Sequence, residues 1–74
     1  MSDRRDMSLQ IGERPINLTQ VLKLSGSVLS GGEAKTLIAL GRVRVNGEVE
    51  FRKRRQMIAG DVVLIDTGDT IKLV

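Results

Sequence analysis

The chain has 74 residues, enough for one small domain with a single hydrophobic core. It contains neither cysteine nor histidine, which excludes a disulfide framework, a Cys/His zinc site and catalysis by histidine. Its net charge of +3 conceals an asymmetry, because residues 35–55 carry seven basic and two acidic side chains while the rest of the chain is net negative. Such a positive region indicates a polyanionic partner, although a solvated face that keeps the protein soluble would look similar.

The amino-terminal residues 1–7 are mostly charged or small, and we expect them to form a disordered tail before a single domain at residues 8–74. No apolar stretch suits a signal peptide or approaches the roughly 20 residues that span a bilayer. We therefore expect a cytoplasmic protein that does not associate with membranes. A short strand should begin near Leu9, and residues 12–15 should form a turn.

The first helix is predicted directly after this turn. Asn17 and Gln20 have the three-residue spacing of a capping box, in which each side chain bonds the backbone amide of the other residue. Apolar side chains at positions 18, 21 and 22 recur at helical spacing, which leaves Lys23 pointing outward. Gly26 can adopt the left-handed conformation that ends a helix, so this helix should have about two turns.

A second helix should begin at Ser30, because Ser30 and Glu33 again have the spacing of a capping box. Its apolar pattern continues for about three turns, until Gly41. Lys35 and Arg42 are seven residues apart, so we expect both to project from the side opposite the apolar stripe. Two glycines near the start of the helix would leave amides open to a phosphate, but Glu33 would repel it.

The apolar pattern then changes from helical to alternating around Asn46-Gly47, the strongest short signal for a β-hairpin. A strict two-residue turn would pair Val45 with Glu48 and place an acidic side chain on the apolar face. A bulged hairpin that pairs Val45 with Val49 avoids this mismatch. The sequence therefore favours the bulge.

The bulged register also fixes the expected directions of the following side chains. Phe51 shares a face with Val49 and should point inward, whereas Glu50 should lie on the solvent face, opposite Arg44. Phe51 is the only aromatic residue of the chain. Stacking of nucleic-acid bases on aromatic side chains is therefore not expected.

Two further strands complete the predicted fold. Residues 62–65 form an apolar run typical of a buried strand, and residues 70–74 alternate as a last strand. The predicted fold class is α+β, with two short helices followed by a small, mainly antiparallel sheet that contains the β-hairpin.

No residue pattern indicates catalysis. The Ser, Asp and Glu residues form no arrangement of nucleophile and base, and the aspartates at positions 61, 66 and 69 lack the spacing of a calcium loop. These aspartates are interpreted as solvated turn carboxylates. We predict a protein that is not an enzyme and has no cofactor, metal or small-molecule substrate.

Four consecutive basic residues occupy positions 52–55. Adjacent like charges repel one another, and a row of phosphates would offset that repulsion. The alternative explanation is a charged edge strand that protects the sheet against aggregation.

Four short motifs follow one another between residues 30 and 63. They are Ser30-x-x-Glu33-Ala34-Lys35, Gly41-x-Val43-x-Val45-Asn46-Gly47, the basic run at 52–55, and Gly60-Asp61-x-Val63. The series resembles the RNA-binding domain named after small-subunit ribosomal protein S-four, also called the alpha-L motif, over about residues 9–74. The short format is similar to the small bacterial YbcJ-like members. The resemblance implies an α+β fold whose helices and hairpin form one basic surface that faces RNA.

We therefore predict a monomeric module that binds the phosphate backbone of structured RNA, of the ribosomal or transfer class, and that can act within a ribosomal particle. The predicted contacts are Lys23, Lys35, Arg42, Arg44, Arg52, Lys53, Arg54 and Arg55. Two alternatives stay open. One is a DNA-binding helix-turn-helix with a β wing, although its second helix would lack the Arg, Asn and Gln residues that read base edges. The other is a protein-interaction module.

Overall fold

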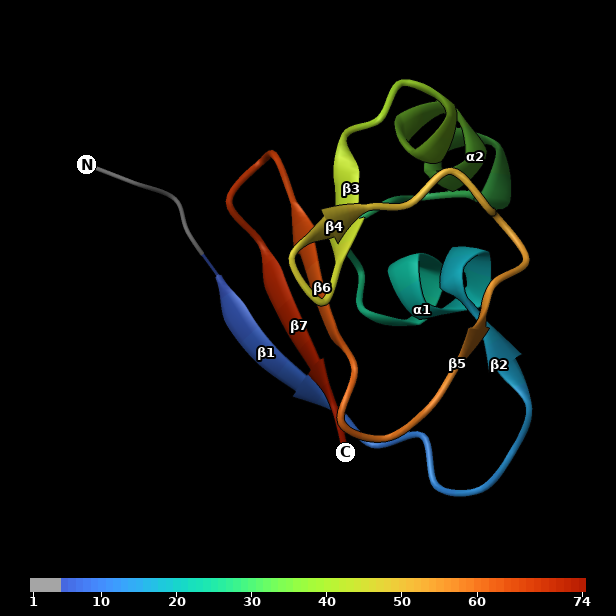
Figure 1. The fold of residues 1–74 in the computed structure, drawn as a ribbon, viewed down its shortest axis with the longest axis vertical. Helices are drawn as coiled ribbons and strands as arrows, with labels where there is room; N and C mark the ends of the chain where they lie inside the picture. The colour runs from blue at the N-terminus through green and yellow to red at the C-terminus, as the bar shows by residue number, and fades with distance from the viewer. Residues whose placement is uncertain (1–4) are drawn as a thin grey trace.

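A computed structural model describes residues 5–74 of the protein. Its main element is a five-stranded sheet, which Figure 1 shows beside two helices. The strands follow the order β1 (Asp6–Leu9), β7 (Thr70–Leu73), β6 (Val62–Ile65), β3 (Val43–Val45) and β4 (Glu48–Val49). β1 runs parallel to β7, and the other neighbouring strands are antiparallel.

The helices are α1 (Leu18–Leu24) and α2 (Gly31–Ala39). A second, antiparallel sheet consists of β2 (Ile16–Asn17) and β5 (Gln56–Met57) and lies next to α1, away from the large sheet (Figure 1). The predicted α+β class with a mainly antiparallel sheet is confirmed. The strand predicted near Leu9 forms the end of β1, whereas the two short strands β2 and β5 were not predicted.

Strand β1 includes two residues that were expected in the amino-terminal tail. Asp6 and Met7 pair with Thr70 and Ile71 of β7, while residues 1–4 lie outside the described residues. This strand lies at the edge of the sheet, where only Met7 and Leu9 pack against the core. Its few apolar residues explain why the composition suggested a tail.

Both helix starts follow the capping signals in the sequence. Asn17 Oδ1 accepts from Gln20 N at 2.9 Å, and Gln20 Oε1 accepts from Asn17 N at 2.9 Å, which completes the predicted capping box. Ser30 Oγ accepts from Glu33 N at 3.2 Å. The carboxylate of Glu33, however, accepts from Leu29 N at 3.3 Å, so only half of the second box forms as predicted.

The core consists almost entirely of aliphatic side chains. Its largest fully buried members come from both helices and three strands: Leu18, Val21, Leu22, Ile38, Val43, Val45, Val63, Ile65, Ile71 and Leu73. Strand β6 was expected to be buried, but Leu64 points outward between the buried Val63 and Ile65. Within residues 5–74, no helix is long and apolar enough to cross a membrane.

The β3–β4 hairpin has a two-residue turn, so the predicted bulge is wrong. Val45 pairs with Glu48, and Arg44 pairs with Val49. Asn46 and Gly47 both have positive φ, 53° and 88°, as a type I′ turn requires. Side chains alternate along a strand. Compared with the predicted register, this register therefore exchanges the side chains of the second hairpin strand that face the core with those that face solvent.

The register therefore buries Glu50 and exposes Phe51, the reverse of the expected arrangement. Glu50 N donates to Val43 O at 3.0 Å, which continues the pairing and directs the Glu50 side chain to the face of Val43. Glu50 is 7% exposed, whereas Phe51 is 64% exposed. A buried carboxylate is unfavourable unless it is paired, so this register requires positive partners close to Glu50.

Candidate nucleic-acid interface

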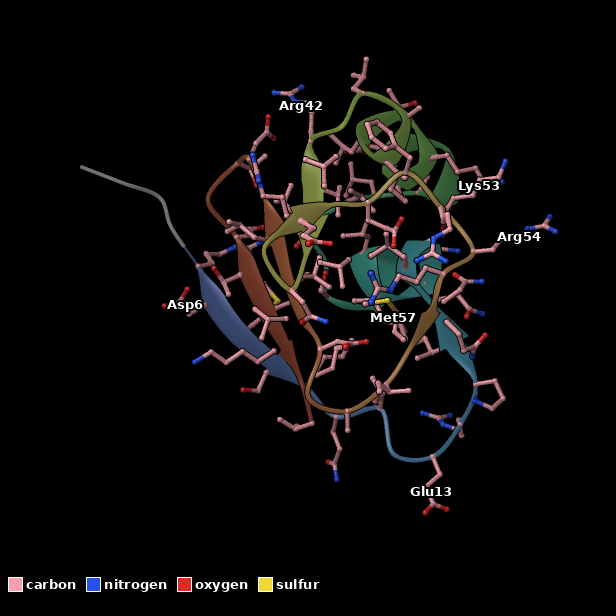
Figure 2. All side chains as sticks on the ribbon, viewed as in Figure 1. Asp6, Glu13, Arg42, Lys53, Arg54 and Met57 are labelled. Atoms are coloured by element: carbon pink, nitrogen blue, oxygen red, sulfur yellow. The ribbon has the colours of Figure 1, made fainter. Side chains whose placement is uncertain are left out.

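Residues 52–55 form a tight turn, which we call the basic loop. Arg55 N donates to Arg52 O at 3.1 Å, so the four basic residues do not form an extended strand. The turn brings its two outer arginines back toward the preceding strand. Lys53 and Arg54 are left exposed at the tip, and Figure 2 shows both side chains pointing away from the body of the protein.

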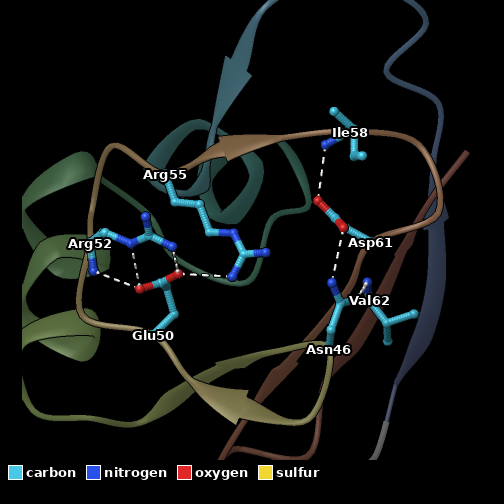
Figure 3. Close-up of polar contacts among 7 residues, drawn as sticks. All are labelled: Asn46, Glu50, Arg52, Arg55, Ile58, Asp61 and Val62. Carbon is cyan, nitrogen blue, oxygen red and sulfur yellow. Dashed lines mark hydrogen bonds and ion pairs between the residues drawn. The ribbon is translucent and has the colours of Figure 1, made fainter.

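Glu50 binds both outer arginines of the basic loop (Figure 3). Its carboxylate accepts hydrogen bonds from Arg52 Nε at 3.2 Å, Arg52 Nη2 at 3.0 Å and Arg55 Nη1 at 2.8 Å. It also accepts from the backbone amide of Arg52 at 3.2 Å. The hydrogen bonds from Arg52 and Arg55 lower the pKa of Glu50 to about 2, although burial acts in the opposite direction. Part of the repulsion that phosphates were expected to offset is therefore offset within the protein.

The backbone of the basic loop is fixed against the start of α1. Leu18 N donates to Arg55 O at 3.0 Å. Thr19 donates to Lys53 O twice, from its amide at 3.2 Å and from Oγ1 at 2.8 Å. The first amides of a helix have no partner within the helix, so the loop carbonyls satisfy groups that would otherwise need water. The loop is consequently held in position while its tip side chains stay exposed.

An open groove lies between α2 and the basic loop, and we call it the basic groove. Its lining residues are Lys35, Ile38, Ala39, Phe51, Arg52, Lys53, Arg54, Arg55 and Gln56. Five of these nine residues are basic and none is acidic. A concave surface lined by charge of one sign concentrates the electrostatic field, so this groove can attract a polyanion.

Arg42 lies outside the basic groove. Its Nε donates to Asp66 Oδ2 in the turn between β6 and β7, and Figure 2 shows Arg42 well away from Lys53 and Arg54. The expected alignment of Lys35 and Arg42 on one helix face is wrong. The helix ends before Arg42, and Gly41, with φ of 73°, redirects the chain.

Arg44 and Lys23 also lie apart from the groove. Arg44 projects from the outer face of β3, beside Val49, and lines a hollow near the β6–β7 turn. Lys23 lies on α1 and lines a different hollow that includes Pro15. The structure thus places Lys35 and the basic loop together, and separates Arg42, Arg44 and Lys23 from them.

Two motifs of the sequence have a structural role that residue spacing did not reveal. Asn46 Nδ2 donates to Asp61 Oδ1 at 3.0 Å, and Asn46 Oδ1 accepts from Val62 N at 2.9 Å (Figure 3). Asp61 Oδ2 also accepts from Ile58 N at 3.0 Å. The Asn-Gly turn and the later Gly-Asp motif therefore stabilise each other.

The interpretation of the aspartates as solvated turn carboxylates is wrong for two of the three. Asp61 and Asp69 are both buried. The hydrogen bond from Arg5 to Asp69, 3.2 Å long, lowers the pKa of that carboxyl group. Asp66 is exposed and pairs with Arg42. Among residues 5–74, no group of three or more carboxylates is placed to bind a metal ion.

Sequence reasoning missed Glu50 and Thr19, the residues that position the basic loop. Glu50 was placed on the solvent face, and Thr19 carried no signal of its own. The usable signal for Glu50 was a glutamate with arginines two and five positions later, a spacing that a tight turn converts into ion pairs.

The chain matches the family described as "S4 domain" over residues 9–74. The protein of Escherichia coli (strain K12) named "Putative RNA-binding protein YbcJ" is 40% identical over 68 residues, which cover 90% of this chain and 96% of that protein. The Bacillus subtilis (strain 168) protein named "Probable ribosome maturation protein RlbA" is 36% identical over 66 residues, covering 89% and 93% of the two chains.

The solution structure of YbcJ from E. coli, described as revealing an alpha-L motif involved in RNA binding, has the same fold. It aligns with a TM-score of 0.65 at 39% identity, and the alignment covers 100% of this chain and 91% of that one. Agreement in sequence and fold over nearly the full length of both proteins shows that this chain belongs to the S4 domain family and has an alpha-L motif fold.

Proposed function

We propose that this protein binds the phosphate backbone of structured RNA in the basic groove. The observation that carries the proposal is the fixed basic loop, which holds Lys53 and Arg54 across an open groove from Lys35. The relatives named for RNA binding and ribosome maturation support RNA as the polyanion.

The fixed loop backbone favours binding because less conformational freedom is lost when the RNA arrives. The hydrogen bonds to α1 already order the main chain of the loop, so mainly side chains must be immobilised. We assign Lys35, Lys53 and Arg54 as the primary phosphate contacts. Arg52 and Arg55 act chiefly through Glu50, which uses several of their donors.

The remaining predicted contacts have secondary roles in this proposal. Arg42, Arg44 and Lys23 are exposed on neighbouring surfaces and would meet only an RNA that extends beyond the groove. The protein acts as a monomer in the cytoplasm, without enzymatic activity or a cofactor, on RNA of the ribosomal or transfer class. The name of the B. subtilis relative supports a ribosomal particle as the setting.

Binding of duplex DNA by α2 is a weaker explanation of the same charges. The helix has nine residues, and its exposed side chains include Lys35 and Thr36 but no Arg, Asn or Gln. The Thr36 hydroxyl donates to Gly32 O at 3.0 Å within the helix. The helix therefore offers few groups that could read base edges in a major groove.

The experiment is a salt series of equilibrium binding to an RNA hairpin and to a DNA hairpin of the same sequence. Wild type should bind RNA more tightly, and Lys53→Ala/Arg54→Ala should weaken RNA binding. The salt slope of the double variant should flatten by about 1.4–1.8, the loss of two phosphate contacts. The control Arg14→Ala/Lys72→Ala removes two exposed basic residues outside the groove and should keep the slope. Equal slopes for wild type and Lys53→Ala/Arg54→Ala would contradict the assignment.

A further inference from the structure

Phe51 is an exposed aromatic residue inside the basic groove. Its side chain lines the groove together with Lys35 and all four residues of the basic loop. It is 64% exposed, although it is the only aromatic side chain of the protein and was expected in the core. The two-residue hairpin turn causes this exposure, because the register turns Phe51 to the side opposite Glu50.

The ring of Phe51 is supported on one side by the turn that follows α2. A Cβ atom at Gly41 would come within 3.3 Å of two ring carbons, so the ring lies directly against this backbone. Gly41 also has a φ of 73°, a left-handed conformation that favours glycine, and a Cβ atom there would crowd the ring. The ring is thus held against main chain on one side, and most of its surface stays open.

An open ring in a groove lined by cationic side chains suits a nucleobase better than it suits an apolar partner. The phosphates of a nucleic acid would contact Lys35, Lys53 and Arg54, and the groove offers no acidic side chain to repel them. Aromatic rings stack on bases that are not already stacked in a helix. Bases inside a continuous A-form duplex are closed to such contact, whereas an unpaired nucleotide can reach the ring.

We propose that Phe51 stacks on an unpaired nucleobase of the bound RNA. The preferred ligand of the basic groove is then a helical RNA interrupted by an unpaired nucleotide, such as a bulge, rather than an uninterrupted duplex. This inference rests on the proposed binding of RNA phosphates in the same groove, and it adds a recognition element that carries no charge.

The test compares binding to two RNA hairpins that differ by one bulged nucleotide. Wild type should prefer the bulged hairpin by about five-fold to a hundred-fold, the range expected for one stacked base. Phe51→Ala should abolish this preference and leave the salt slope unchanged, because no charge is removed. The matched control Ile58→Ala removes an equally exposed apolar side chain outside the groove and should keep the preference.

A fluorescent base, 2-aminopurine, at the bulged position gives a second readout. Stacking on Phe51 should change its emission when wild type binds, and Phe51→Ala should not produce the same change. Phe51→Leu keeps apolar contact with Gly41 but lacks an aromatic face, so it should behave like Phe51→Ala. This variant also serves if Phe51→Ala folds poorly.

The outcomes separate the two proposals. Steep, salt-dependent binding of wild type to both hairpins without a preference would overturn the stacking role and leave the phosphate contacts in place. A preference for the bulged hairpin that survives in Phe51→Ala and Phe51→Leu would also overturn the stacking role and leave the phosphate contacts in place. Failure of wild type to bind either RNA at low salt would overturn both proposals, and would leave Phe51 as part of a protein-docking surface.

Discussion

The burial of Glu50 predicts a measurable loss of stability in Glu50→Gln. The substitution keeps the shape of the side chain but removes its charge and replaces one acceptor oxygen with a donor. Arg52 and Arg55 then lose a carboxylate that accepts four hydrogen bonds from them. The variant also leaves the basic loop with its positive charges uncompensated, so both the core and the loop are affected.

The exposure of the two arginines sets the size of the effect. Hydrogen bonds to charged groups contribute about 1.5–3 kcal/mol where water cannot replace them, but exposed ion pairs contribute about 0–1 kcal/mol. The side chain of Arg52 is 73% exposed and that of Arg55 is 28% exposed, so Arg55 should account for most of the loss. We expect Glu50→Gln to lower the free energy of unfolding by about 2 kcal/mol. For a domain of this size, Tm should fall by about 8–16 °C.

The dependence on pH tests the cause of this loss. The pKa of Glu50 is lowered from 4.5 to about 2 in the folded protein, so the charged carboxylate stabilises the fold fully above pH 4.5. That contribution declines as the pH falls from 4.5 to about 2. The difference in the free energy of unfolding between wild type and Glu50→Gln should therefore have its full value at pH 7 and be close to zero at pH 2.

Thermal and urea unfolding followed by circular dichroism would measure both the loss of stability and its dependence on pH. Glu48→Gln is the matched control, since Glu48 lies two residues earlier in the same hairpin and is exposed. It should change Tm little at either pH. Equal stability of Glu50→Gln and wild type at pH 7, or a difference that persists at pH 2, would refute the proposed role of the buried carboxylate.

Two further substitutions test the hairpin turn and the fixed loop. Gly47→Val should lower the free energy of unfolding by at least about 1 kcal/mol, because a β-branched residue is strained at the φ of 88°; unaltered thermal unfolding would contradict the type I′ turn. Thr19→Val removes the hydroxyl that donates to Lys53 O and should cost about 0.5–1.5 kcal/mol. It should also speed hydrogen exchange at the amides of Leu18 and Thr19, and unchanged exchange would show that the hydroxyl does not fix the loop.

Local signals in the sequence predicted the helices well. The capping box of Asn17 and Gln20 and the serine at position 30 place both helix starts correctly, because a cap depends on residues within one turn. The S4 resemblance and the α+β class were likewise confirmed. These features depend on short-range patterns or on an ordered series of motifs.

Contacts between distant or unexpected partners explain what could not be predicted. Strands β2 and β5 have two residues each and are paired across about forty positions of sequence, so neither has a pattern of its own. The hairpin register was wrong because charged residues were assumed to face solvent. That assumption fails at Glu50, where two arginines from the following turn make burial tolerable.

The burial of Glu50 also reverses the direction of Phe51 relative to the expected one. Once Glu50 faces inward, Phe51 must face outward into the basic groove. The sequence also did not predict that the basic residues lie on separate surfaces. Arg42, for example, follows a glycine that ends the helix and redirects the chain. Charge counting located the basic region, and only the fold showed which charges act together.

The most direct test of the central claim is chemical-shift mapping of the ¹⁵N-labelled protein during titration with a structured RNA. We expect the largest shifts at Lys35, Phe51 and the basic loop, and smaller shifts at Thr19, which donates a hydrogen bond to a carbonyl of the loop. Largest shifts at Arg42, Arg44 or Lys23, with the basic loop unmoved, would contradict the claim that the basic groove is the RNA-binding site.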